Sequence, residues 1–106
     1  NSSSSHAMQL KISKRARTDI RVAASWWRAN RPLAPLMFDD ELERALVLIE
    51  SQPQAGPPAL DVPMAGVRRV SLHRTRYLLY YRLRPEQDAI EVLRLWHTSR
   101  GTAPKL

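Results

Sequence analysis

The sequence predicts an α+β domain with the element order β-α-α-β-β-β, in which a helical hairpin packs on one face of a mainly antiparallel sheet. Two segments with helical periodicity follow one another early in the chain, and three strand-like segments joined by short turns end it. Helices grouped before such a meander indicate an α+β fold, and short turns require antiparallel neighbours. The last strand-like segment, Ala89–Arg100, is apolar on both faces, which places it in the middle of the sheet.

Length and composition agree with one small globular domain. The chain has 106 residues, of which 43% are hydrophobic. It contains no apolar run of about 18 residues and no secretory signal, so we expect no membrane contact. Because it also has no cysteine, we expect a cytoplasmic protein. We interpret residues 1–7 as an expression scar, residues 8–100 as a single domain and residues 101–106 as a polar tail.

The first strand and first helix are predicted over Met8–Ile12 and Lys14–Asn30. Ser13 stands at the N-cap position between them. One face of the helix carries apolar residues at helical spacing, namely Ala16, Ile20, Ala23, Ala24 and Trp27. Val22 and Trp26 lie off this face, and they either pack against the second helix or form a docking patch for a partner.

A second helix is predicted over Leu36–Gln52, after a short connector with two prolines. Its apolar face consists of Phe38, Leu42, Ala45, Leu46 and Ile49. The acidic run from Asp39 to Glu41 favours the helix dipole, and we interpret it as a solvated helix start rather than a metal site. The two helices therefore form an antiparallel hairpin. Pro53–Gly66, rich in proline and glycine, is predicted to be a loop.

The strands of the meander are Val67–His73, Tyr77–Arg84 and Ala89–Arg100. Arg74–Arg76 forms the first turn, and Pro85–Asp88 forms the second, with proline well placed at its start. The last strand ends in the polar cluster His97, Thr98, Ser99 and Arg100. This end of the central strand is the first candidate for a functional site.

Charge is distributed unevenly along the chain, whose formal net charge is +7. The first helix and the strands of the sheet are basic, whereas the second helix is acidic. A basic sheet indicates an anionic partner, which would be nucleic acid, a machine bound to nucleic acid or an acidic protein. The alternative is a soluble domain that merely has a high isoelectric point.

Several segments together resemble the RelE/ParE superfamily of bacterial type II toxins. They are KRARTDI in the first helix, the acidic second helix with its Pro/Gly loop, VRRVSLHRTRYLLYYRL, and the ending EVLRLWHTSR, which is similar to the family's strand closing in His-x-x-Arg. The resemblance covers nearly all of Met8–Arg100. It implies a toxin that arrests growth and is neutralised by a cognate antitoxin. RelE-like members cut mRNA in the ribosome, whereas ParE-like members poison DNA gyrase and are not thought to be enzymes.

Cleavage of RNA would need an acid, a base and cations on the phosphate, without a metal. The residues that could supply them are His97, Arg100, Arg76 and Arg82. However, RelE-like nucleases tend to carry Tyr-Arg-Leu-Val-Tyr in the strand where this chain has Tyr-Leu-Leu-Tyr-Tyr, so Leu78 replaces an arginine. On strict alternation Glu91 shares a face with His97, but lies about 20 Å away. We therefore favour the gyrase-poisoning mechanism, in which His97 and Arg100 either contact the target or have a structural role.

The resemblance also implies an acidic antitoxin whose helix lays its apolar face on the helical hairpin. Candidate contacts are Val22, Trp26, Arg68, Arg82 and Arg84. The same patch would let the free toxin form a homodimer. A third hypothesis is a basic nucleic-acid-binding module in which Tyr77, Tyr80 and Tyr81 stack on bases. We expect no cofactor and no metal, because His73 and His97 lack a third ligand at a recognisable spacing.

Overall fold

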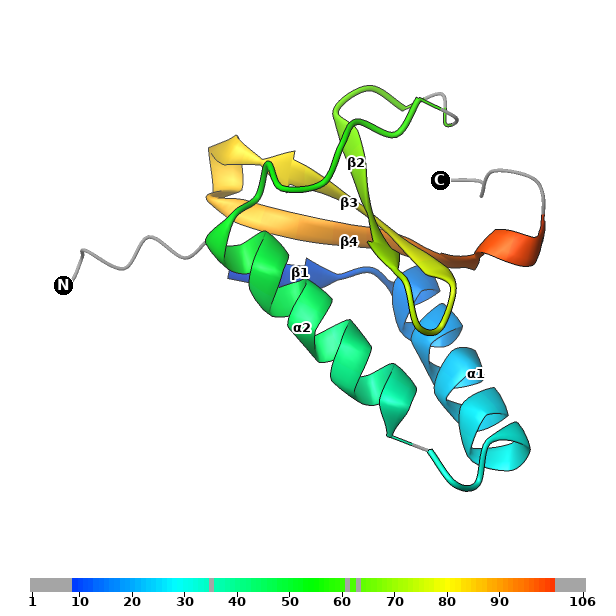
Figure 1. The fold of residues 1–106 in the computed structure, drawn as a ribbon. Helices are drawn as coiled ribbons and strands as arrows, with labels where there is room; N and C mark the ends of the chain where they lie inside the picture. The colour runs from blue at the N-terminus through cyan, green and yellow to red at the C-terminus, as the bar shows by residue number, and fades with distance from the viewer. Residues whose placement is uncertain (1–8, 35, 61, 63, 101–106) are drawn as a thin grey trace, which may run out of the picture.

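The computed structural model describes residues 9–34, 36–60, 62 and 64–100, without the side chain of Arg100. Within these residues the elements are β1 Gln9–Ile12, α1 Lys14–Asn30, α2 Met37–Ser51, β2 Val67–Leu72, β3 Tyr77–Arg84 and β4 Ala89–His97, with short 3-10 helices at Pro85–Gln87 and Thr98–Arg100 (Figure 1). The predicted α+β fold and element order are confirmed. The interpretations of residues 1–7 and 101–106 fall outside the described residues.

The four strands form one mixed sheet in the order β1-β4-β3-β2. β1 runs parallel to β4, whereas β4–β3 and β3–β2 are antiparallel pairs. The central position predicted for the last strand is therefore confirmed. None of the described helices is long and apolar enough to cross a membrane.

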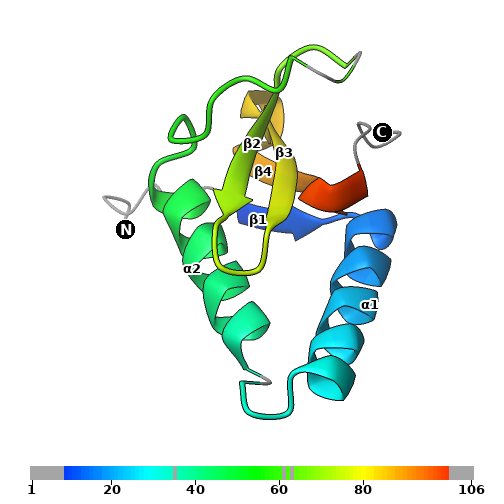
Figure 2. The same ribbon diagram turned by 45° about the vertical axis from the view of Figure 1, so that its right-hand side comes forward.

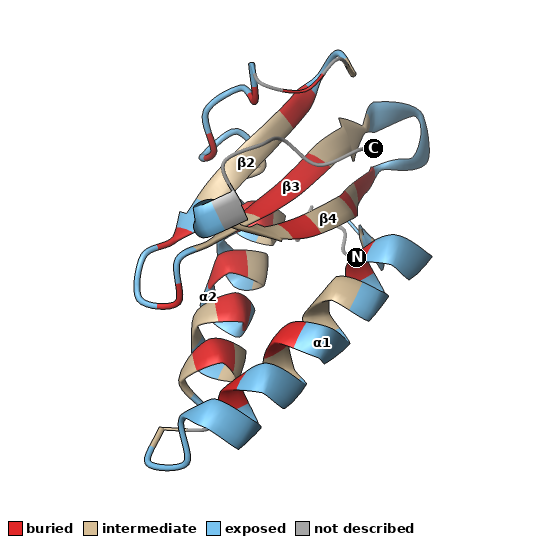
Figure 3. Ribbon diagram, turned by 90° about the vertical axis from the view of Figure 1, so that its right-hand side faces the viewer, coloured by how far each residue is buried: buried red, intermediate tan, exposed pale blue. Residues whose placement is uncertain are grey.

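α1 begins at the predicted cap, because the Ser13 Oγ accepts a hydrogen bond from the Ala16 amide at 3.1 Å. The α1 and α2 helices meet at their connector and spread apart toward the sheet (Figure 2). Both bury their predicted stripes against the same face, where buried positions recur along each helix (Figure 3). We call this side of the sheet the helix-side face. The large residues of the core between it and the helices include Phe38, Ile49, Leu72, Leu79, Tyr81, Ile90 and Val92.

The opposite face of the sheet, hereafter the outer face, is covered by the Pro/Gly loop. Its core consists of Ala59, Val62, Val67 and Tyr80, with Leu78, Leu93, Trp96 and Met64 packed against it. The Tyr81 hydroxyl anchors the loop, since it donates to the Pro53 carbonyl at 2.8 Å and accepts from the Gly56 amide at 3.1 Å. Position 56 requires glycine, because a Cβ there would clash with the Arg69 carbonyl oxygen at 2.6 Å.

A bulge in β4 changes which side chains share a face. Tyr80 pairs with Arg94 but Tyr81 pairs with Val92, so Leu93 is an extra residue. Beyond it the alternation is reversed. Glu91 lies on the outer face with Arg82, whereas His97 contacts Tyr77 on the helix-side face. The expectation that Glu91 and His97 share a face was therefore wrong.

Candidate functional site

His97 is held in a fixed orientation at the end of β4. Its ring packs edge-on against Tyr77, with centroids 4.9 Å apart, and Tyr77 packs in the same way against Phe38 at 5.3 Å. The Ser99 amide donates to His97 Nδ1 at 3.1 Å, and the Ser99 hydroxyl lies 2.6 Å from the same nitrogen. Because Nδ1 accepts a hydrogen bond, the neutral ring carries its proton on Nε2.

This histidine borders a hollow of about 510 Å³ on the helix side of the molecule. Its lining residues come from the end of α1, the β2–β3 turn and the end of β4: Trp26, Trp27, Arg31, Arg74, Thr75, Arg76, Tyr77, His97 and Ser99. We call it the cationic hollow, because three arginines and no acidic side chain are found among these described residues. The Arg31 guanidinium lies over the Trp27 ring, 5.7 Å from its centroid.

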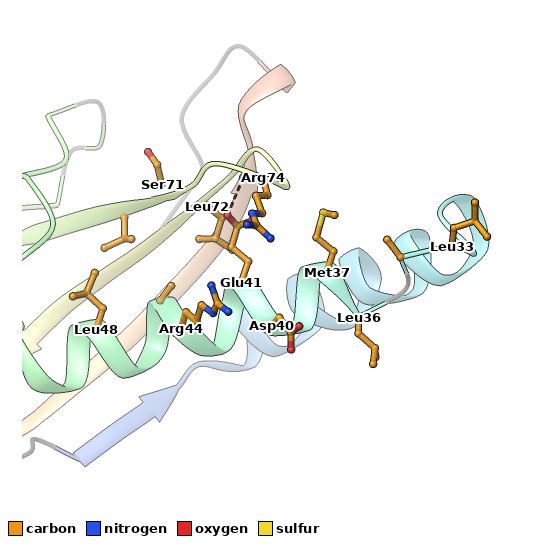
Figure 4. Close-up of a pocket in the computed structure, with 13 residues that line it drawn as sticks. Leu33, Leu36, Met37, Asp40, Glu41, Arg44, Leu48, Ser71, Leu72 and Arg74 are labelled. Atoms are coloured by element: carbon orange, nitrogen blue, oxygen red, sulfur yellow. Dashed lines mark hydrogen bonds between the residues drawn. The ribbon is translucent and has the colours of Figure 1, made fainter.

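The turn that carries Arg74 and Arg76 is held by Glu41 of α2. The Glu41 carboxylate accepts a hydrogen bond from the Arg74 amide at 2.8 Å (Figure 4). It also accepts from the Thr75 amide at 2.9 Å and the Thr75 hydroxyl at 2.8 Å. Burial would raise the pKa of Glu41, but these hydrogen bonds outweigh it, so the pKa lies below its ordinary value. The sequence suggested only a solvated helix start here, and nothing in it pointed to the turn 33 residues away.

The structure brings together only some of the predicted site residues. Trp26, Arg76 and His97 line the same hollow. The side chain of Arg100 lies outside the described part of the chain. Arg82 is on the outer face, where it bonds Glu91 at 2.9 Å. The residues considered for RNA cleavage are therefore divided between two faces of the sheet.

The remaining basic residues proposed for antitoxin contact are engaged within the chain. Arg84 bonds Glu86 at 2.6 Å and Glu91 at 3.2 Å. The bond with Glu86 is the main reason why the pKa of Arg84 is raised. Arg68 donates to the Gly56 carbonyl at 2.7 Å. These side chains can meet a partner only by sharing or exchanging these contacts.

Two apolar surfaces are exposed on the helices. Val22 is 62% exposed and Trp26 is 48% exposed, so both project from the surface of α1. The second surface is a groove of about 600 Å³ between α2 and β2, which the sequence did not reveal (Figure 4). Its apolar lining includes Leu33, Leu36, Met37, Leu48 and Leu72. We call it the α2 groove.

Two other features bear on the alternatives. Tyr80 and Tyr81 are 1% and 0% exposed, so neither offers a ring face for stacking on a base. Across the described residues, no group of three His, Cys, Asp or Glu side chains could hold a metal ion.

A comparison with protein families matches residues 10–101 to the ParE toxin of the type II toxin–antitoxin system parDE. The chain belongs to this family of toxins. Solved structures with the same fold include a chromosomal ParDE toxin–antitoxin system from P. aeruginosa, with TM-score 0.70 and 20% identity, covering 88% of this chain and 98% of that chain. No curated protein matches the sequence.

Structures from the RelE branch also share the fold of this ParE-family toxin. The intact E. coli RelBE complex has TM-score 0.63 and 18% identity, covering 87% of this chain and 98% of that chain. The isolated E. coli RelE toxin has TM-score 0.61 and 19% identity, covering 86% and 84%. The resemblance to the RelE/ParE superfamily is thus confirmed, while the choice between its two mechanisms depends on the residues.

Proposed function

We propose that this ParE-family toxin arrests growth by poisoning DNA gyrase, without cleaving RNA, and is neutralised by a cognate antitoxin. The observation that carries the proposal is the separation of the groups that RNA cleavage would need. His97 and Arg76 lie on the helix side, whereas Arg82 lies on the outer face and is paired with Glu91.

The state of His97 also argues against general acid–base catalysis. With Nδ1 occupied by the Ser99 amide, the neutral ring presents an N–H at Nε2 and has no free lone pair to accept a proton. Protonating Nδ1 to make an acid would break that hydrogen bond. Leu78, at the position of the arginine in RelE-like nucleases, packs against the outer apolar core and offers no cation. His97 is therefore better suited to donate a hydrogen bond to a target.

A supercoiling assay with purified gyrase tests the mechanism. We expect the toxin to abolish supercoiling, or to accumulate cleaved DNA, and we expect the antitoxin to reverse this effect. A parallel assay measures mRNA cleavage on translating ribosomes. Unaffected gyrase together with cleaved mRNA that His97→Ala abolishes would refute the proposal and establish the nuclease.

The antitoxin is proposed to cover the exposed apolar residues of α1, with the α2 groove as a second contact. The solved ParDE and RelBE systems pair related folds with antitoxins, which supports a protein partner of this kind. We expect Trp26→Ala to weaken antitoxin binding about tenfold or more, since exposed aromatics at interfaces are frequent hot spots. Thr18→Ala, at an exposed position of the same helix, is the control. Equal affinity of the two variants, measured by calorimetry, would remove Trp26 from the interface. Size-exclusion chromatography of free wild type and Trp26→Ala tests self-association.

A further inference from the structure

We propose that the cationic hollow is a binding site for the phosphate group of a nucleotide. The inference concerns the helix side of the molecule and does not depend on gyrase being the target. Arg74, Arg76 and the Nε2–H of His97 would contact the phosphate, and Trp26 would contact the base.

The charge around the hollow is unbalanced. Arg31, Arg74 and Arg76 line it, and none of its lining residues is acidic. Arg31 and Arg76 make no ion pair within the described part of the chain. Glu41 directs its oxygens to the backbone amides of Arg74 and Thr75 and to the Thr75 hydroxyl, and it also attracts the Arg74 guanidinium. The unbalanced charge is therefore that of Arg31 and Arg76. Such a set of donors without a matching anion is suited to a phosphate, which several N–H groups can bind together.

The backbone of the turn that carries Arg74 and Arg76 is held in place before any ligand binds, and so is the His97 ring. Glu41 holds both amides of the turn, and Thr75 beside it is only 3% exposed. The Ser99 amide fixes the His97 ring with Nε2–H available. A preorganised site of this kind loses less conformational entropy on binding.

Arg76 has an unfavourable backbone conformation, and a role of its side chain in binding would explain why arginine is found there. Its φ of 62° lies in the left-handed region, where glycine or asparagine is favoured. The other non-glycine residue with positive φ in the described chain is Asp88, a residue type that adopts this conformation readily. Strained positions of this kind gather at ligand sites. An arginine retained here is consistent with a side chain needed for binding.

The aromatic residues decide in favour of a nucleotide over a bare anion. Trp26 is 48% exposed at the border of the hollow, and its neighbour Trp27 packs edge-on against it with centroids 5.8 Å apart. An exposed indole next to guanidinium groups combines base stacking with phosphate binding. A hollow of about 510 Å³ lies in the size range of small-molecule sites.

Titration of the ¹⁵N-labelled protein with AMP, adenosine, inorganic phosphate and a single-stranded oligonucleotide tests the site. We expect AMP to cause saturable chemical-shift changes of the amides of Thr75, Arg76 and Ser99. Inorganic phosphate should bind more weakly than AMP, and adenosine should not bind. Arg76→Gly should weaken AMP binding about tenfold or more. It should also raise the Tm by about 4–8 °C, because glycine adopts the left-handed conformation of this position without strain. Tighter binding of the oligonucleotide would identify a nucleic-acid strand as the source of the phosphate. Tighter binding of AMP would identify the free nucleotide.

Arg21→Gln is the matched control, because Arg21 is an exposed arginine of α1 that does not line the hollow. It should change AMP affinity less than twofold. Equal weakening by Arg21→Gln and Arg76→Gly would show that only net charge matters and would overturn the proposal. The absence of saturable shifts, or inorganic phosphate binding as tightly as AMP, would also overturn it.

Discussion

Removing the Glu41 carboxylate is expected to destabilise the fold by about 2–3 kcal/mol. The three hydrogen bonds that Glu41 accepts do not contribute equally. Arg74 is exposed, so water can replace the carboxylate at its amide at little cost. Thr75 is 3% exposed, and its amide and hydroxyl would both lose their partner, at about 1–3 kcal/mol for a buried polar group.

Urea unfolding of Glu41→Ala measures this loss, with Glu43→Ala as the control. Glu43 is exposed on the same helix, and its replacement should change stability by less than about 0.5 kcal/mol. The pKa of Glu41 is lowered in the folded state from its ordinary value of 4.5. Its contribution is therefore complete above that value and is lost as the pH falls through the depressed folded pKa. The difference between wild type and Glu41→Ala should shrink in the same range.

Two results would refute this reasoning. One is equal stability of Glu41→Ala and Glu43→Ala at neutral pH, which would mean that water satisfies Thr75 as well as the carboxylate does. The other is a stability difference that stays constant on acidification, which would show that Glu41 acts through packing and not through its charge.

Two further substitutions test the loop and the contact between α1 and β4. Gly56→Ala should cost about 1–3 kcal/mol in urea unfolding, because its Cβ would lie 2.6 Å from the Arg69 carbonyl oxygen; an unchanged midpoint would show that the loop shifts freely. Asp19→Ala should cost about 2–3 kcal/mol, because it removes bonds of 2.7 and 3.2 Å to the Arg94 guanidinium and one of 3.1 Å to the Leu95 amide. We expect slow hydrogen exchange of the Leu95 amide in wild type and faster exchange in Asp19→Ala, because the variant lacks the acceptor of this amide. Equal exchange rates in both proteins would contradict this prediction.

Periodicity predicted the elements well because burial follows it in this chain. The helical stripe ending at Trp27 gave α1 with its observed bounds, and Ser13 gave its cap. The run apolar on both faces identified β4 as central, since both faces of the sheet are covered. Short turns fixed the antiparallel pairing of the meander.

The arrangement of the candidate site depended on features that periodicity cannot express. The bulge at Leu93 shifts β4 by one residue, so everything beyond it changes face. A strand of nine residues read with strict alternation therefore places His97 on the same face as Glu91. The sequence contains no glycine or proline there to mark the irregularity.

Long-range polar contacts were equally hidden. Glu41 bonds a turn 33 and 34 residues away, Tyr81 bonds loop residues 25 and 28 positions earlier, and Asp19 bonds β4 across 75 and 76 residues. From the sequence, Glu41 was part of a solvated helix start and Tyr81 a candidate for stacking on bases, and neither interpretation indicates a distant partner. Only the tertiary structure places their partners within reach.

The cationic hollow and the α2 groove are physically connected through the turn that carries Arg74. Arg74 lines both the cationic hollow and the α2 groove, and Glu41, which holds its amide, also lines the groove. A partner that enters the groove and moves Glu41 would move the turn, and with it Arg74 and Arg76. By linkage, a ligand in the hollow would then change the affinity of the groove by the same factor. An antitoxin helix in the α2 groove would thus alter the hollow through the turn, in addition to covering Trp26 at its border.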